Sequence, residues 1–183
     1  HALRIQDEGV DGVIASGNEA GGHVGKVATL PLVPQVVDAL DIPVLAAGGI
    51  GDARGFVAML ALGAVGVQLG TRLIATDEAD VNEWYLGRIL DMSATDTVVS
   101  AALTGATVRC IATPEIIAFE EARLRGADAG ELQALRQVAR ENYGHSDKID
   151  RSKRRQGTAG QVAGMITDIQ PAAKIVEDMI NGA

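Results

Sequence analysis

The stretch Gly17-Asn-Glu-Ala-Gly-Gly-His-Val-Gly25 decides how this chain is interpreted. It directly follows residues 10–16, a short apolar run that predicts a buried strand. Its four glycines allow a ligand to approach the backbone closely and permit angles that other residues avoid. The stretch also carries His23, a side chain that gains and loses a proton near neutral pH. A histidine that can transfer a proton, beside a glycine-rich loop that a ligand can approach closely, is the pattern expected of a cofactor-dependent enzyme.

Two further strands are predicted downstream, and glycine follows each of them. Residues 43–49 are an apolar run that ends in two glycines, and residues 65–71 end in Gly-Thr. Between the first two strands, residues 31–40 have apolar side chains at helical spacing, with prolines in the first turn. Strands that alternate with helices over short connections indicate a parallel sheet with right-handed crossovers. The fold class is therefore α/β, with about three parallel strands in residues 1–75.

Residues 76–183 form a second part that is predicted to be mainly helical. A basic run at 148–155 is interpreted as a solvated loop, and contact with the phosphates of a carrier-protein or coenzyme A substrate is the alternative. The helices are expected near residues 78–92, 113–125, 129–142 and 171–181.

Composition narrows the class of protein. The 183 residues are 47% hydrophobic but only 3% aromatic, which suits a parallel-sheet core of small aliphatic side chains. The net charge of -8 argues against a nucleic-acid partner. The uncharged stretch at residues 56–71 is too short to span a membrane and contains three glycines. We therefore expect a protein that binds neither nucleic acid nor membrane.

Cysteine and histidine usage adds two expectations. Cys110 is the single cysteine and cannot form an internal disulfide, which fits a reducing, cytoplasmic location. We interpret it as an inert, small apolar residue rather than a nucleophile. One cysteine and three scattered histidines provide no metal-ligand set, so no metal is expected.

The second and third glycine loops suggest a phosphate site. Ligands of parallel α/β folds bind at the carboxyl edge of the sheet, where all three loops would lie. Backbone N–H groups there can hold a phosphate without Lys or Arg. The loops at Gly48-Gly49 and Gly70-Thr71 are one βα unit apart. In (β/α)₈ barrels, the loops after the seventh and eighth strands share a phosphate at this spacing, which suits flavin mononucleotide (FMN).

Three motifs together resemble the nitronate monooxygenase family: Gly17–Gly25, Ala46-Ala-Gly-Gly-Ile50 and Gln68-Leu-Gly-Thr71. They resemble equally the flavin-dependent enoyl-acyl-carrier-protein reductases, which share the fold. The resemblance runs from about residue 3 to the C-terminus and includes Thr158-Ala-Gly-Gln-Val-Ala-Gly164. It implies an FMN-binding (β/α)₈ TIM barrel. Since three strands cannot close a barrel, we expect this chain to be its C-terminal part, with the N-terminal half missing.

The resemblance also implies roles for individual residues. His23 would lie near the flavin and transfer a proton, as the base that takes an α-proton from a nitroalkane or as the proton donor to an enoyl thioester. Ser16 stands where many family members have Gln. Glu19 is interpreted as a brace for the loop, with a direct chemical role as the alternative. The implied cofactor-binding residues are Ser16, Gly21, Gly22, Gly48, Gly49, Gln68, Leu69, Gly70 and Thr71.

Three functions remain open at the level of the sequence. The first is oxidation of alkyl nitronates or nitroalkanes with O₂ by an FMN enzyme. The second is reduction of an enoyl thioester, which would add NAD(P)H as the reductant. The third is a non-catalytic half-barrel subunit that completes a partner chain. The expected partners are a small-molecule or acyl-thioester substrate and the N-terminal half of the same barrel, with a homo-oligomer as a further alternative.

Overall fold

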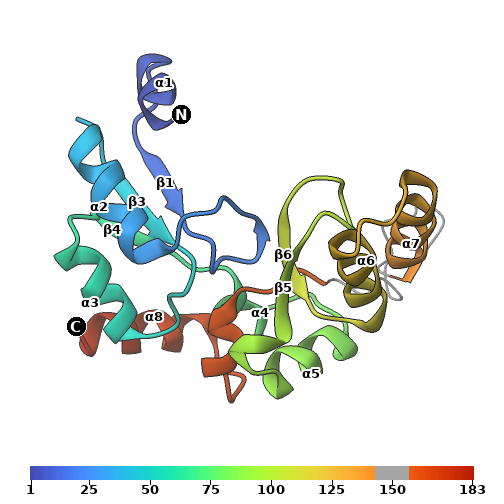
Figure 1. Ribbon diagram of the computed structural model, residues 1–183. Helices are drawn as coiled ribbons and strands as arrows, with labels where there is room; N and C mark the ends of the chain where they lie inside the picture. Colours follow the sequence, from blue (N-terminus) through green and yellow to red (C-terminus); the bar gives the residue numbers. More distant parts are fainter. Residues whose placement is uncertain (143–156) are drawn as a thin grey trace.

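The computed structural model describes residues 1–142 and 157–183, and their strands form two three-stranded sheets (Figure 1). The first sheet is parallel, in the order β1-β3-β4, and helices α2 and α3 connect its strands. The predicted α/β class and the three parallel strands in residues 1–75 are thus confirmed. The bounds are α1 Ala2–Asp7, β1 Val13–Ser16, α2 Thr29–Ala39, β3 Val44–Ala47, α3 Ala53–Ala61 and β4 Gly66–Gln68.

The helices of this part begin where side chains cap them. Asp52 precedes α3, and its carboxylate accepts hydrogen bonds from the N–H groups of Arg54 (3.0 Å) and Gly55 (3.2 Å). This confirms the N-cap that the residue type predicts. Helix α2 begins at Thr29, two residues before the predicted start, because a carboxylate from outside the helix binds its first N–H group. As a result Pro34 lies inside the helix rather than in its first turn.

The second sheet is antiparallel, in the order β2-β6-β5. Its strand β2 is part of the predicted glycine loop, and β5 and β6 form a hairpin in the part predicted to be mainly helical. The sequence did not predict this sheet. The bounds are β2 Gly22–His23, β5 Thr97–Ser100 and β6 Val108–Ile111.

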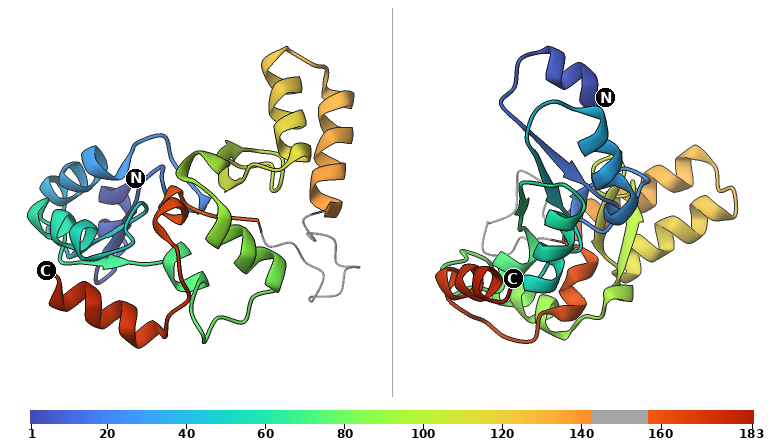
Figure 2. Two further views of the ribbon diagram at one scale, coloured as in Figure 1. Left: turned by 90° about the horizontal axis from the view of Figure 1, so that it is seen from below. Right: turned by 90° about the vertical axis from the view of Figure 1, so that its left-hand side faces the viewer.

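The four helices expected after residue 76 are present. Helices α6 and α7 pack against each other on the side of the antiparallel sheet that faces away from β1, β3 and β4, whereas α8 packs against α3 (Figures 1 and 2). None of the described helices is long and apolar enough to cross a membrane. The bounds are α4 Thr71–Ile74, α5 Glu83–Asp91, α6 Pro114–Leu124, α7 Ala129–Asn142 and α8 Ala172–Asn181, with short 3₁₀ helices at Ala94–Asp96 and Gln161–Met165.

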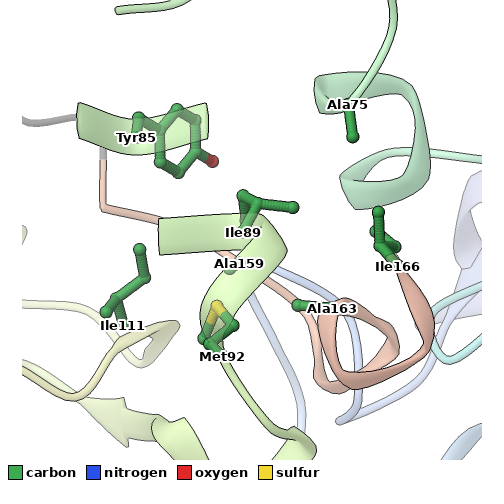
Figure 3. Close-up of a cluster of buried hydrophobic side chains, with 8 residues drawn as sticks. All are labelled: Ala75, Tyr85, Ile89, Met92, Ile111, Ala159, Ala163 and Ile166. Carbon is green, nitrogen blue, oxygen red and sulfur yellow. The ribbon is translucent and has the colours of Figure 1, made fainter. Parts of the chain in front are cut away.

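The buried side chains form three clusters. One lies around the parallel sheet and includes Val33 and Ala46, and a second lies between the antiparallel sheet and α6 and includes Phe119. The third joins α5 to the C-terminal segment, where Ile89 packs near Ala163 (Figure 3). This third cluster brings residues 157–166 back beside the glycine loops.

Candidate functional site: a pocket at the carboxyl edge of the parallel sheet

A pocket of about 280 Å³ lies where the three glycine loops meet, at the carboxyl ends of β1, β3 and β4. This is the edge at which parallel α/β folds bind ligands. Its volume is near the lower end of the range typical of complete ligand sites, about 300–1,000 Å³. It is lined by Ser16, Glu19, Ala20, Gly21, Ala47, Gly48, Gly49, Ile50, Gln68, Gly70, Thr71, Ile74, Tyr85, Thr158, Gly160 and Val162.

Seven of the nine predicted binding residues line this pocket, whereas two of them and the predicted catalytic residue His23 do not. Leu69 packs against the hydrophobic cluster of the parallel sheet, and Gly22 and His23 form β2. Contact with a cofactor stays a prediction for all of the predicted residues, inside and outside the pocket. The predicted residues that the structure brings together are Ser16, Gly21, Gly48, Gly49, Gln68, Gly70 and Thr71.

The glycines of the pocket are of two kinds. A Cβ at Gly48, where φ is +95°, would lie 2.9 Å from the amide nitrogen of Ala20, and one at Gly21 would lie 2.8 Å from that of Gly160. These two glycines let parts of the chain pack closely against each other. Gly70 differs, since a Cβ there would meet no atom within 4 Å. Its bare backbone borders open space, so this side of the pocket leaves room for a ligand.

Glu19 ties the first loop to helix α2. Its carboxylate accepts a hydrogen bond from the Thr29 N–H group at 2.8 Å and lies 3.0 Å from the Thr29 hydroxyl. The same hydroxyl lies 3.0 Å from the Gly48 carbonyl oxygen, so it can donate its single hydrogen to either acceptor. A carboxylate at a helix N-terminus also interacts favourably with the helix dipole. The bracing role predicted for Glu19 is confirmed, and it links the loops after β1 and β3.

The segment 157–161 closes the pocket from the opposite direction. The Gly160 N–H group donates to the Thr71 hydroxyl at 2.9 Å, and the Gln161 N–H group donates to the Glu19 carbonyl oxygen at 2.9 Å. The Tyr85 hydroxyl donates to the Thr158 carbonyl oxygen. Burial raises the pKa of Tyr85 to about 12, so the hydroxyl remains a donor at neutral pH. The first and third glycine loops are therefore held in contact with this late segment.

His23 lies two residues beyond the pocket residue Gly21, and its side chain is exposed. In the antiparallel ladder it pairs with Val108 of β6. The next N–H group, that of Val24, donates to the Thr107 carbonyl oxygen at 3.2 Å. The histidine segment is thus a strand with a defined partner rather than a free loop.

Several pocket residues could not be assigned from the sequence. Tyr85 has the pattern of an ordinary helical core residue, and nothing nearby distinguishes it. Gly160 falls in the 158–164 motif, which the resemblance included without a role, so a signal for it was present. The unassigned lining residues are Ala20, Ala47, Ile50, Ile74, Tyr85, Thr158, Gly160 and Val162.

Cys110 lies away from the pocket. Cys110 is fully buried, and burial raises the pKa of its thiol to about 12. Its prediction as an inert residue is confirmed, because a thiol is reactive mainly as the thiolate. The basic run at 148–155 lies outside the described residues.

A parallel sheet whose three strands end in glycine loops around one pocket defines an α/β protein of the barrel type with a ligand site at the carboxyl edge. The sequence model of nitronate monooxygenase matches residues 1–182. The chain belongs to the nitronate monooxygenase family, whose members are oxidoreductases and generally depend on a flavin.

Two curated relatives show where this chain is similar. A "probable nitronate monooxygenase" of Staphylococcus saprophyticus is 45% identical over 121 residues, which are 60% of this chain and 34% of that protein. A protein of Rhodococcus jostii is 42% identical over 135 residues, 73% of this chain and 38% of that protein. Its name is (3aS,4S,5R,7aS)-5-hydroxy-7a-methyl-1-oxo-octahydro-1H-indene-4-carboxyl-CoA dehydrogenase. The chain matches little more than a third of the length of either relative.

Solved structures agree with the family. FabK from Thermotoga maritima superposes with a TM-score of 0.82 at 38% identity, over 98% of this chain and 56% of that one. The nitroalkane oxidase from Streptomyces ansochromogenes superposes with a TM-score of 0.74 at 30% identity, over 98% of this chain and 53% of that one. The chain therefore corresponds to about half of each of these folds, as predicted for part of a TIM barrel.

Proposed function

We propose that these residues form the cofactor-binding part of an FMN-dependent enzyme that oxidises alkyl nitronates or nitroalkanes with O₂. The observation that carries this proposal is the convergence of three glycine-ended strands on one pocket. Membership of the nitronate monooxygenase family supports the reaction class. The likeness to a nitroalkane oxidase supports the substrate class.

The chemistry of the pocket fits an FMN phosphate. Gly48 and Gly49 both have positive φ, +95° and +75°, and Gly70 borders open space. Backbone N–H groups in such loops bind phosphate without a basic side chain. Gly48, Gly49, Gly70 and Thr71 would hold the phosphate, and Gln68 would contact the rest of the cofactor. When bound, FMN accepts electrons from the substrate.

In this proposal His23 moves the substrate proton. A nitroalkane loses its α-proton to the imidazole and becomes a nitronate, and the imidazole becomes imidazolium. An imidazole suits this step because its ordinary pKa lies near neutral pH. Since the side chain is exposed and close in sequence to the pocket residue Gly21, a substrate at the mouth of the pocket could reach it.

The test replaces His23 in the whole protein that contains these residues. His23→Ala should slow turnover of a small nitroalkane by ~10²–10⁴-fold, the usual contribution of a positioned acid or base. Bound FMN, measured by its visible absorbance, should remain. His23→Asn is the matched control for shape, and it should be as slow as His23→Ala. Normal turnover in both variants would sink the assignment.

A second candidate is reduction of an enoyl thioester with NAD(P)H. It is favoured by the Rhodococcus jostii relative, whose name is that of a dehydrogenase of a carboxyl-CoA compound, and which matches the larger share of this chain. In that reaction His23 would donate a proton to the substrate. Anaerobic addition of ethyl nitronate or of NADH decides between the two. Bleaching of the flavin by NADH, followed by recovery with crotonyl-CoA, would overturn our choice.

We also propose that the N-terminal half of the same barrel pairs with this sheet. Strands β1 and β4 are its edges, and each has one partner among the described strands. Ile14 in β1 is 52% exposed, and Val65, just before β4, is 63% exposed. Apolar edge strands favour pairing with further strands. A yellow, soluble, monomeric protein made from residues 1–183 alone would contradict this partner, and failure of the complemented barrel to bind FMN would support the non-catalytic alternative.

A further inference from the structure

Arg109 is a buried cation that the proposed chemistry does not use. It lies on β6 and is 6% exposed. Its Nε donates to the Asn18 carbonyl oxygen at 2.7 Å, and its Nη2 donates to the Asn18 side-chain Oδ1 at 2.7 Å. Its Nη1 donates to the Thr97 hydroxyl of β5 at 2.8 Å. The guanidinium therefore binds Asn18 through two hydrogen bonds, and a third hydrogen bond attaches it to β5.

Asn18 joins the two ends of the loop that carries His23, residues 17–27, which we call the histidine loop. Its N–H group donates to the Val27 carbonyl oxygen at 2.8 Å, and its Nδ2 donates to the Gly25 carbonyl oxygen at 2.6 Å. All four polar groups of Asn18 are thus bonded. Two of them close the loop on itself, and the other two attach the closed loop to Arg109.

The same strand also holds the histidine directly. In the ladder between β2 and β6, Gly22 pairs with Arg109 and His23 pairs with Val108. The loop is therefore fixed to β6 twice, by the ladder at His23 and by the Arg109 side chain at Asn18. Two attachments to one rigid strand restrict the rotation that a single short ladder of two residues would leave free.

We propose that Arg109, acting through Asn18, is the residue that positions His23 for proton transfer. The proposal rests on the function assigned to His23 above. Arginine suits the task because its planar fork matches two acceptors at once, which the single ammonium of lysine does not. Loss of these hydrogen bonds should slow the reaction strongly, because a displacement of a catalytic group by about 1 Å can lower the rate by about 10²-fold.

The test measures the histidine itself as well as turnover. In the whole FMN-loaded protein with ¹³C-labelled histidine, the His23 ring signal is assigned by its loss in His23→Asn. Arg109→Lys should split or broaden that signal and lower kcat for nitroethane, whose α-proton His23 would remove, by about 10²-fold. KM and the bound FMN should change little, because no cofactor-binding residue has been altered.

Two variants of Asn18 test the proposal with Arg109 unchanged, so they remain informative if the Arg109 variant does not fold. Asn18→Ala removes the side-chain acceptor and the closure to Gly25, so it should disturb the His23 signal as Arg109→Lys does. Asn18→Asp keeps an acceptor for Nη2 and should recover part of both the signal and kcat. Recovery by the conservative variant is an effect that loss of general stability would not produce.

Arg72 provides a matched control. It is 7% exposed and donates to one residue in the same way, to the Asp168 carbonyl oxygen and to its Oδ1, both at 3.1 Å. Arg72→Lys should lower the midpoint of urea unfolding about as much as Arg109→Lys does. It should leave the His23 signal unchanged, because Asp168 is outside the histidine loop.

A single sharp His23 signal with unchanged kcat in both Arg109→Lys and Asn18→Ala would overturn the proposal. An equal disturbance of His23 in Arg72→Lys would also overturn it, because the effect would then be general. If His23→Asn turns over normally, the assigned function fails instead. The position of the His23 signal in the Arg109 variant still decides whether Arg109 positions the ring.

Discussion

The two sheets of this molecule are assembled in opposite ways. The parallel sheet pairs strands that follow one another along the chain, whereas the antiparallel sheet pairs Gly22 with Arg109, far away in the sequence. The parallel sheet contributes mainly backbone to the pocket, through its glycine loops. The antiparallel sheet instead holds the segment of His23, which lies beyond the pocket residue Gly21. In the proposed function, binding and proton transfer would therefore have separate supports, which substitutions can disturb one at a time.

The largest effect on stability is expected in the cluster behind the antiparallel sheet. Phe119 is 1% exposed and packs in the cluster that includes Cys110 and Val108 of β6. Its ring also lies 5.5 Å from the Arg136 guanidinium. Phe119→Ala should cost about 3–5 kcal/mol of unfolding free energy, from lost burial and the cavity left behind. Urea unfolding measures this cost, and Phe119→Leu, which keeps most of the volume, should cost about 1.5 kcal/mol or less. A cost below about 1 kcal/mol for the alanine variant would contradict the assigned core.

Substitution of one glycine in each region allows the parallel and the antiparallel sheet to be compared directly. Gly48 and Gly22 both have positive φ, +95° and +87°. A Cβ at Gly48 would lie 2.9 Å from the Ala20 nitrogen, whereas one at Gly22 would meet nothing within 4 Å. Gly48→Ala should therefore cost about 2–4 kcal/mol, from backbone strain and overpacking together. Gly22→Ala should cost about 1–2 kcal/mol from strain alone. Equal costs, measured by urea unfolding, would mean that the contact between the first two glycine loops is not tight.

Glu19→Gln tests the link between the loops after β1 and β3. The Thr29 N–H group lies within hydrogen-bond distance of both carboxylate oxygens, at 3.1 Å and 2.8 Å. In glutamine an –NH₂ group that cannot accept replaces one of them, and the negative charge at the start of α2 is lost. The expected cost is about 1–2 kcal/mol. Glu83 is a matched control, since it is exposed in the first turn of α5, and Glu83→Gln should cost about 0.5 kcal/mol or less. Thermal unfolding of both variants checks the comparison, which fails if the two costs agree.

The smallest effect concerns pH and the start of α3. The side-chain hydrogen bond from Arg54 lowers the pKa of Asp52 below its usual 3.8, with further help from the N–H groups that it caps. A carboxyl whose pKa is lowered by folding stabilises the protein above its unfolded-state pKa, and this contribution is lost as pH falls through the folded-state pKa. Asp52→Asn keeps the cap but does not titrate. The wild type should therefore lose slightly more stability than this variant between about pH 5 and pH 2. Urea unfolding of both proteins across this pH range measures the difference. An equal loss of stability in the two proteins would contradict the contribution of the ion pair.

The sequence predicted the parallel sheet because its signals are local. Each strand is an apolar run that glycine follows, and the helix between the first two strands has its own apolar periodicity. Strand β2 gave no such signal, because two residues are too few to show an alternation and their partner strand is remote in the sequence. The sequence analysis also did not find β5 and β6, since four-residue strands between helices resemble connecting loops.

The pocket was predicted in outline for the same reason. Gly48, Gly49 and Gly70 could be placed at one edge once the strands were parallel. Tyr85 and Gly160 could not, because their approach to the pocket depends on packing between elements distant in the chain. The loop that carries His23 is likewise bonded through Asn18 to Arg109, a residue that no motif includes.

The hydrogen bonds from Gly160 and Gln161 to the glycine-loop region have a consequence for synthesis. All three glycine loops have been synthesised once Thr71 is added, and the segment that closes them begins at residue 157, roughly 4–17 s later at about 5–20 residues per second. During that interval the glycine loops of the pocket are present, but residues 157–161, which close it, are not. We therefore expect the proposed cofactor to be captured only after residues 157–161 have emerged.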